Sequence, residues 1–311
     1  MCMDRLMNKP DLLNLFKTIS VWSRGDERAP HKPLLLLYAL GRLINDSERL
    51  INFREVDKEL KILLQEFGPS RKSYHTEYPF WRLQNDNIWQ VEATDKDELK
   101  YRQEKPGKYH SDVLKSELIK CNAKGGFTAE VFAKLHNDPN LLKEIVLYLL
   151  GTCFPETVHE DILAAVGLTL INSSGTPSSK VKRSPAFREN ILRVYGYACA
   201  VCGLNIRYSN NSSLCIEAAH IKWHQAGGPD SENNGLALCV LHHKLFDRGA
   251  FSISNEGNIL VSQHIHGESG LQEWLLNHHG KAVTSPISPE YMPHNDFVHW
   301  HRKEVFKSPE R

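Results

Sequence analysis

Cysteine and histidine are concentrated in the last third of this 311-residue chain, in a pattern that suits metal chemistry. Four of the seven cysteines lie between Cys199 and Cys239, and eleven of the sixteen histidines lie at or after His220. No apolar leader segment is visible in residues 1–11. We therefore expect a cytoplasmic protein in which clustered cysteine and histidine bind metal rather than form disulfides.

Two ligand pairs predict a structural zinc site. Cys199-x-x-Cys202 and Cys239-x-x-His242 are separated by 36 residues. A tetrahedral zinc ion takes four nitrogen or sulfur ligands, and one tight turn can supply two of them. The competing interpretation is that these cysteines are small buried residues, a common environment for free cysteine. The double pairing favours zinc, and we expect Cys215 to be a core residue instead.

Three further polar residues lie inside this zinc frame: His220 in EAAHIKW, Asn234 in NNGLAL and His243 in HHKLFDRG. Over residues 195–255 this order resembles the HNH endonuclease family, which has a ββα-metal fold. The tail FVHWHRKEVF is similar to the terminal segment of a subgroup of that family. The resemblance implies a metal-dependent enzyme that hydrolyses phosphodiester bonds in DNA.

Phosphodiester hydrolysis suggests a role for each of these residues. His220 is expected to be the general base, because imidazole can accept a proton near neutral pH. His243 is expected to bind a catalytic divalent metal, Mg²⁺ or Mn²⁺, that neutralises charge on the phosphate. Asn234 is expected to fix the loop between strand and helix, with a simple turn role and Asn233 as alternatives. His242 and His243 could exchange roles, but the knuckle spacing favours His242 for zinc.

One position departs from the family pattern. Many members have Asp immediately before the base, as a second metal ligand, and this chain has Ala219 there. Glu217 or Asp247 could assist instead, or the metal could rely on phosphate oxygens; Asp247 could alternatively brace the end of the helix.

Residues 180–223 carry seven Lys or Arg and two Glu, a net charge of +5. This segment is either a solvated face or, as we prefer, a phosphate contact.

Two short motifs stand out in the first half of the chain. RAPHKP (28–33) places basic residues and two prolines at a predicted helix N-terminus, which suits a phosphate. EYPFWRL (77–83) is aromatic and apolar, and could equally be ordinary strand core. Over residues 10–150 these motifs resemble the sulfur-binding domain that is fused to HNH nucleases and recognises phosphorothioate DNA. The residues carried over are listed here, with Arg28 and Arg82 the weaker assignments: Arg28, His31, Lys32, Tyr78, Pro79 and Arg82.

The elements that must position these residues follow from hydrophobic periodicity. Helices are predicted over residues 11–23, 32–43, 53–67, 111–121, 128–136, 139–150, 156–168 and 185–195, and a β-hairpin over 79–93. Residues 173–184 have linker composition. We thus expect an α+β protein with a helix-rich recognition domain (1–155), a bridge and linker (156–184) and a zinc-stabilised ββα-metal nuclease domain (185–311).

Composition is consistent with this reading. Hydrophobic residues make up 41% and charged residues 24%, as in soluble globular proteins, and no apolar run is long enough to span a membrane. The net charge of +1 gives no global attraction to nucleic acid. We predict a modification-dependent restriction endonuclease, acting as a homodimer on phosphorothioated double-stranded DNA. The alternatives are an HNH nuclease whose first domain reads another mark, such as a methylated base, and a non-catalytic zinc DNA-binding protein.

Overall fold

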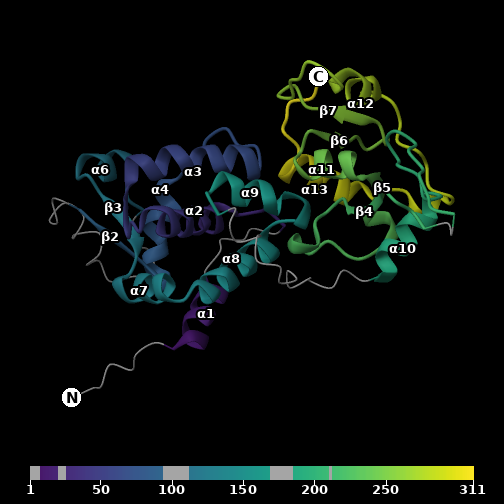
Figure 1. Ribbon diagram of the computed structural model, residues 1–311. Helices are drawn as coiled ribbons and strands as arrows, with labels where there is room; N and C mark the ends of the chain where they lie inside the picture. The colour runs from purple at the N-terminus through teal and green to yellow at the C-terminus, as the bar shows by residue number, and fades with distance from the viewer. Residues whose placement is uncertain (1–7, 20–25, 94–111, 169–184, 210–211) are drawn as a thin grey trace.

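The computed structural model of the chain has two lobes (Figure 1), and each lobe has its own main hydrophobic core. The structure describes residues 8–19, 26–93, 112–168, 185–209 and 212–311. The first core takes its buried residues from Leu12 to Leu168, and the second takes them from Phe187 to Val298. The mixed helix and sheet content confirms the predicted α+β class. No helix among the described residues is long and apolar enough to cross a membrane.

The first core is built mainly from helices that wrap a small sheet. Helix α2 is central to it, and nine of its residues from Leu34 to Leu43 are buried because its sequence is apolar on nearly every side. The helices are α1 (Lys9–Lys17), α2 (His31–Asp46), α3 (Phe53–Phe67), α4 (Glu77–Arg82), α6 (Lys115–Lys120), α7 (Ala129–Asn137), α8 (Pro139–Cys153) and α9 (His159–Ala165), with 3-10 turns η1 (Leu83–Asp86) and η2 (Glu156–Val158). Residues 158–168, placed in the bridge by the sequence, contribute to this core.

The three strands of the first domain form one antiparallel sheet. They are β1 (Leu50–Asn52), β2 (Trp89–Glu92) and β3 (Lys124–Phe127), in the order β1-β3-β2. Helix α3 coincides with the predicted range, and Asn52 caps it by accepting from the Arg54 amide. The predicted linker centre, residues 173–184, lies outside the described residues.

The predicted hairpin over residues 79–93 is wrong in its first half. EYPFWR forms helix α4, and only residues 89–92 form a strand. Phe80 and Trp81 are buried by helical rather than strand geometry, while Asn87 adopts the left-handed conformation (φ 58°) that reverses the chain into β2. Tertiary burial against α2 and α3 therefore overrode the β-propensity of the aromatic residues.

The second domain contains an antiparallel strand pair followed by a helix, as expected for a ββα-metal domain. Helix α10 (Pro185–Val194) is followed by β4 (Ile216–His220), β5 (Gly235–Cys239), α11 (Val240–Asp247) and β6 (Phe251–Ile253). Strands β4 and β5 form an antiparallel hairpin in which His220 lies opposite Gly235. The remaining elements are β7 (Ile259–Val261), α12 (Leu271–Trp274), α13 (Asn295–Glu304) and the 3-10 turns η4 (His224–Ala226), η5 (Glu232–Asn234), η6 (Leu276–His278) and η7 (Pro289–Tyr291).

The two domains meet through polar contacts from widely separated parts of the sequence. Arg28 donates from Nη1 to the Glu304 carbonyl oxygen (2.8 Å), and Trp300 donates from Nε1 to the Asp26 carbonyl oxygen (2.7 Å). Arg248 pairs with Glu66 at 2.6 Å. Helix α13 of the second domain thereby lies against the loop that leads into α2 of the first.

Candidate functional site

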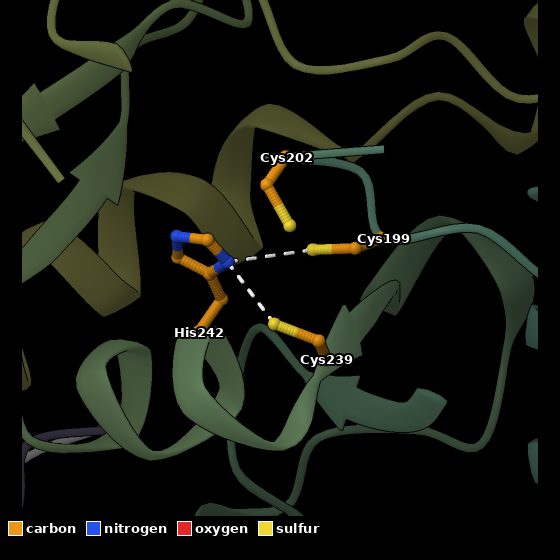
Figure 2. A group of neighbouring side chains, drawn as sticks. All are labelled: Cys199, Cys202, Cys239 and His242. Carbon is orange, nitrogen blue, oxygen red and sulfur yellow. Dashed lines mark hydrogen bonds between the residues drawn. The ribbon is translucent and has the colours of Figure 1, made fainter. Parts of the chain in front are cut away.

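The four predicted zinc ligands converge on one point (Figure 2). One ligand atom from each of Cys199, Cys202, Cys239 and His242 lies within 4.8 Å of the others. Nδ1 of His242 lies 3.2 Å from the sulfur of Cys239 and 3.6 Å from that of Cys199. The cluster joins the loop after α10 to the end of β5 and the first turn of α11.

The histidine of this cluster has its tautomer set by a second contact. Nε2 of His242 lies 2.7 Å from the Trp274 carbonyl oxygen, which can only accept a hydrogen bond. The proton therefore sits on Nε2. The lone pair of Nδ1 points toward the sulfurs, where a metal would be held. A backbone acceptor behind a metal-binding histidine is the usual arrangement around zinc. Three sulfurs and one imidazole nitrogen thus form a donor set that fits Zn²⁺.

His220 stands at the end of β4, between a carboxylate and an aromatic ring. Its Nε2 lies 2.8 Å from Oδ1 of Asp230, and its ring stacks on Phe187 of α10 with centroids 4.0 Å apart. With Nε2 donating to Asp230, the acceptor nitrogen of the neutral ring is Nδ1, which is the atom a base would use to take a proton. The side chain is only 10% exposed, so its orientation is fixed by packing as well as by hydrogen bonding.

Asn234 is fully buried and fastens the loop between β4 and β5. Its Oδ1 accepts from the Lys222 amide (2.9 Å), and its Nδ2 donates to the carbonyl oxygens of Lys222 (3.0 Å) and Pro229 (2.9 Å). Gly228 lets the loop close, because a Cβ there would lie 1.8 Å from the Lys222 carbonyl oxygen. The side chain of Asn234 thus holds the loop between β4 and β5, where the sequence predicted a loop between strand and helix. Asn233 accepts from Ser231 Oγ through its side chain and from the His294 amide through its carbonyl oxygen.

His243 lies between two carboxylates. Nδ1 is 2.7 Å from Oε2 of Glu217 on β4, and Nε2 is 3.2 Å from Oδ2 of Asp247 one turn along α11. Burial alone would lower the pKa of His243, but Asp247 and Glu217 outweigh it and raise that pKa to about 9. Asp247 is held in turn by Trp223 Nε1 (3.1 Å) and by the Thr157 hydroxyl of the first domain.

This arrangement bears on the missing aspartate at position 219. Side chains alternate between the two faces of a strand, so Glu217 and Ala219 share one face of β4. Glu217, two positions before Ala219 on the same face, therefore brings a carboxylate to Nδ1 of His243. The side chain of Glu217 is 42% exposed. With the Nε2 proton donated to Asp247, the Nδ1 nitrogen and the Glu217 oxygen form a donor pair that fits a divalent cation.

A second candidate site is a cavity of about 620 Å³ in the first domain. Residues of the two motifs singled out in the sequence meet there, although they are about 45 positions apart. The lining includes His31 and Lys32 from α2, and Tyr78, Pro79 and Arg82 from α4, together with Glu27, Arg28, Ala29, Arg71, Ser73, His75 and Asn85. The start of α2 and the start of α4 thus share one wall.

Tyr78 has its ring fixed on two sides. The His75 ring stacks on it with centroids 4.9 Å apart, and the Arg82 guanidinium lies 4.7 Å from its centroid. Arg82 is itself held by both oxygens of Asp112, at 2.8 and 2.6 Å. An aromatic side chain clamped in this way offers a rigid apolar surface beside Pro79.

The charges around the cavity are mostly paired. Lys32 Nζ lies 2.5 Å from the nearly buried Asp86, so part of its charge is already neutralised. Burial, assisted by Arg71 and His75, lowers the pKa of His31 to about 4, so that His31 is neutral at pH 7. His31 is therefore not the third cation that the motif suggested.

Arg28 has contacts different from those a phosphate ligand needs. Its Nη2 donates to the Phe67 carbonyl oxygen (2.9 Å), and its guanidinium lies 3.9 Å from the Trp223 ring centroid. With Nη1 donating to the Glu304 carbonyl oxygen, the guanidinium is committed to the domain interface. Arg28 lines the cavity wall, but its guanidinium group makes its contacts at the interface between the two domains.

Several residues of these sites were not found from the sequence. Asp230 and Phe187, which hold His220, are ten and thirty-three positions from it, and Arg71 lines the cavity from outside both motifs. Asp230 belongs to the loop GGPDSENN (227–234), whose Gly, Pro and Asn residues are typical of a turn and do not single out this carboxylate. No local pattern announces Phe187 or Arg71, because their partners lie on other elements.

Family comparisons match the two halves of the chain to two families. Residues 9–171 match the model of the ScoMcrA-like DNA sulfur-binding domain, and residues 199–254 match that of an HNH endonuclease. The first match covers more than half of the 311 residues. No curated protein matches the sequence.

Several solved structures resemble parts of the chain. The sulfur-binding domain of ScoMcrA complexed with phosphorothioated DNA is 20% identical over 51% of this chain and 96% of its own, with a TM-score of 0.42. The corresponding domain of SprMcrA, also complexed with phosphorothioated DNA, is 20% identical over 53% and 96%, again with a TM-score of 0.42. The modification-dependent restriction endonuclease TagI is 24% identical over 42% of this chain and 41% of its own, with a TM-score of 0.29.

Proposed function

Because this chain belongs to the ScoMcrA-like DNA sulfur-binding domain family and also carries an HNH endonuclease domain, we propose that it recognises phosphorothioated DNA and cuts nearby. The chain is a metal-dependent DNA endonuclease of the modification-dependent restriction type. The observation that supports sulfur recognition most directly is the cavity in which His31, Tyr78 and Pro79 come together.

The walls of this cavity suit a sulfur atom better than an oxygen atom. Sulfur in a phosphorothioate is larger and less strongly hydrated than the oxygen it replaces, so burial against apolar atoms favours it. Tyr78 and Pro79 provide that apolar wall, and the neutral His31 adds no charge that would favour a hydrated anion. Lys32, Arg71 and Arg82 supply positive charge for the phosphate that carries the sulfur.

In the nuclease domain, we propose that His220 is the general base. Oδ1 of Asp230 accepts a hydrogen bond from Nε2–H and so keeps the imidazole in one tautomer, which leaves Nδ1 to take a proton from the attacking water. Phe187 holds the ring plane by stacking. Asn234 keeps the loop after β4 closed, so the base stays at the strand end where the phosphate must be placed.

His243 of α11 and Glu217 of β4 would together hold a divalent cation, Mg²⁺ or Mn²⁺. The cation would neutralise charge that develops on the scissile phosphate. Asp247 keeps the proton on Nε2 of His243, which leaves Nδ1 to the metal. Cys199, Cys202, Cys239 and His242 would hold a structural Zn²⁺ that joins β5 and α11 to the preceding loop.

A single HNH site cuts one strand at a time, so cutting both strands favours a homodimer. We propose that this homodimer acts in the cytoplasm. Light scattering of the full chain, alone and with a modified duplex, tests this part of the proposal. One chain per particle, about 35.5 kDa of protein both alone and in the complex with the duplex, would contradict dimerisation.

The proposed sulfur recognition is tested by dissociation constants for one duplex with and without a single phosphorothioate, at one salt concentration. We expect Tyr78→Ala and Pro79→Ala to erase most of the preference for the modified duplex while retaining binding to the plain one. Tyr148→Ala is the matched control, since this half-buried tyrosine lines a different cavity. If the ratio of the two constants stays at its wild-type value, the first domain reads its mark elsewhere. A preference for methylated over phosphorothioated duplex would favour a different mark.

A further inference from the structure

Glu304, near the C-terminus of the chain, places a buried carboxylate behind the cavity of the first domain. It is 1% exposed. Its Oε2 accepts from the Arg28 amide at 2.9 Å, and Nη2 of Arg71 donates to Oε1 at 2.9 Å and to Oε2 at 3.1 Å. A buried carboxylate is costly unless it is fully paired. Here both hydrogen-bond partners line the cavity, and Lys303 Nζ lies 4.0 Å from Oε1 in addition. The nuclease domain thus fixes part of the recognition site.

Arg71 both contacts Glu304 and lines the cavity, so it connects the second domain with the cavity. Its Nη1 donates to the carbonyl oxygens of Ser70 (3.2 Å) and Lys303 (3.3 Å), and its Nη2 is occupied by Glu304. Among the residues that the structure describes, none accepts from Nε, and the side chain is 33% exposed. Nη1 and Nη2 are therefore anchored, and Nε remains available to an anion; Arg71 lines this cavity and also a second one that it shares with Glu66 and Arg248. Anchoring removes the rotamer freedom that a free arginine would lose on binding.

We propose that Glu304 is a positioning residue for DNA recognition: it aims Arg71 at the DNA phosphate, so the cavity of the first domain is complete only when helix α13 of the nuclease domain is docked. This inference rests on the proposed function, because it needs the cavity to bind DNA. It makes the nuclease domain part of the reading site as well as the cutting site.

Two other readings of the same contact make different predictions. Glu304 could serve only to hold the domains together, as the pair Arg248–Glu66 does at 2.6 Å elsewhere in the interface. Neither residue of that pair lines the cavity, so Glu66→Gln is a matched control with the same chemical change in the same interface. Alternatively, the carboxylate could compete with phosphate for Arg71, and its removal would then strengthen DNA binding.

The experiment measures dissociation constants of the full chain for plain and phosphorothioated duplexes at one salt concentration. Glu304→Gln keeps one acceptor oxygen for the Arg28 amide, but it removes the charge and replaces the other oxygen with an NH2 group that cannot accept from Arg71. We expect it to weaken binding to both duplexes about tenfold, with the melting temperature and zinc content close to those of Glu66→Gln. In an Arg71→Ala background the same substitution should have little further effect, because Glu304 acts through Arg71.

Three results would overturn the inference: Glu304→Gln changing DNA binding no more than Glu66→Gln does, Glu304→Gln tightening DNA binding, or additive effects of Glu304→Gln and Arg71→Ala. Should Glu304→Gln fail to fold, Arg71→Lys serves instead. Lysine keeps the charge but lacks the second edge of the guanidinium, so wild-type affinity of Arg71→Lys would also refute the inference. A wild-type chain that binds both duplexes equally would contradict the proposed sulfur recognition alone, since the effect of Glu304 is expected on plain DNA as well.

Discussion

The recognition cavity and the nuclease site use charge in opposite ways. The cavity gathers the cationic side chains of Lys32, Arg71 and Arg82, and carboxylates such as Asp86 stand behind them. The nuclease site gathers carboxylates around histidines, with Glu217 and Asp247 on His243. In one region cationic side chains line a cavity and are paired with carboxylates behind them; in the other, carboxylates surround a histidine. Under the proposed function the first contacts phosphate and the second holds a cation.

The difference is clearest in two histidines. Burial and neighbouring cationic groups lower the pKa of His31 to about 4, whereas carboxylates raise the pKa of His243 to about 9. A neutral imidazole suits an apolar cavity wall. The two carboxylates that raise the pKa of His243 also make its surroundings attractive to a cation, and under the proposed function a metal would displace the proton. The environment of each ring, and not the residue type, decides its chemistry.

Loss of zinc should produce the largest difference between the two domains. We expect Cys239→Ser to unfold the nuclease domain and abolish cleavage, because structural zinc contributes about 10–16 kcal/mol in small zinc domains. The first domain has its own core and should keep its thermal transition. Calorimetry and zinc content measure this, with Cys215→Ser, which lies outside the cluster, as control. A Cys239→Ser protein that is folded and active without zinc would contradict a structural role for the zinc ion.

His220→Ala should separate cutting from reading. A general base contributes about 10²–10⁴ in rate, so cleavage should fall by that factor while the dissociation constant for phosphorothioated duplex is unchanged. His299→Ala, an exposed histidine on α13, is the control. Cleavage by His220→Ala within a few-fold of the wild-type rate would show that another group deprotonates the water.

Acidification should destabilise the first domain through His31. Its folded-state pKa of about 4 lies below the ordinary value of about 6.5, so the unfolded chain binds the proton more readily. The stabilisation is complete above pH 6.5 and is lost as the pH falls toward 4, by at most about 3 kcal/mol. Denaturant titrations between pH 4 and 7 should show a flatter profile for His31→Gln than for wild type. The exposed His136→Gln should keep the wild-type slope, and a wild-type slope in His31→Gln would exclude this source.

Glu217→Gln should have a smaller effect, confined to the metal requirement. If this carboxylate replaces the aspartate missing at position 219, its loss should raise the Mg²⁺ or Mn²⁺ concentration for half-maximal cleavage about 10- to 100-fold. DNA binding without metal should be unaffected. Glu273→Gln, an exposed residue of α12, is the control. An unchanged metal requirement in Glu217→Gln would leave His243 without this partner.

The sequence by itself determined the features that depend on local spacing. Two residues between paired ligands suffice to bring Cys199 and Cys202 into one turn, and apolar periodicity suffices to define α3 over residues 53–67. The role of Asn234 in the loop was also predictable, because its partners at residues 222 and 229 belong to the same connection. In each case the relevant contacts are close in sequence.

Only the tertiary structure decided the features that depend on distant partners. EYPFWR became helix α4 because α2 and α3 bury its aromatic side chains, a contact its own sequence does not encode. Arg28 resembled a phosphate ligand until the fold placed Glu304 and Trp223 against it, nearly 200 or more residues away along the chain. The physical reason is that the orientation and charge state of a polar group depend on what surrounds it, and those surroundings come from elements that only folding brings together.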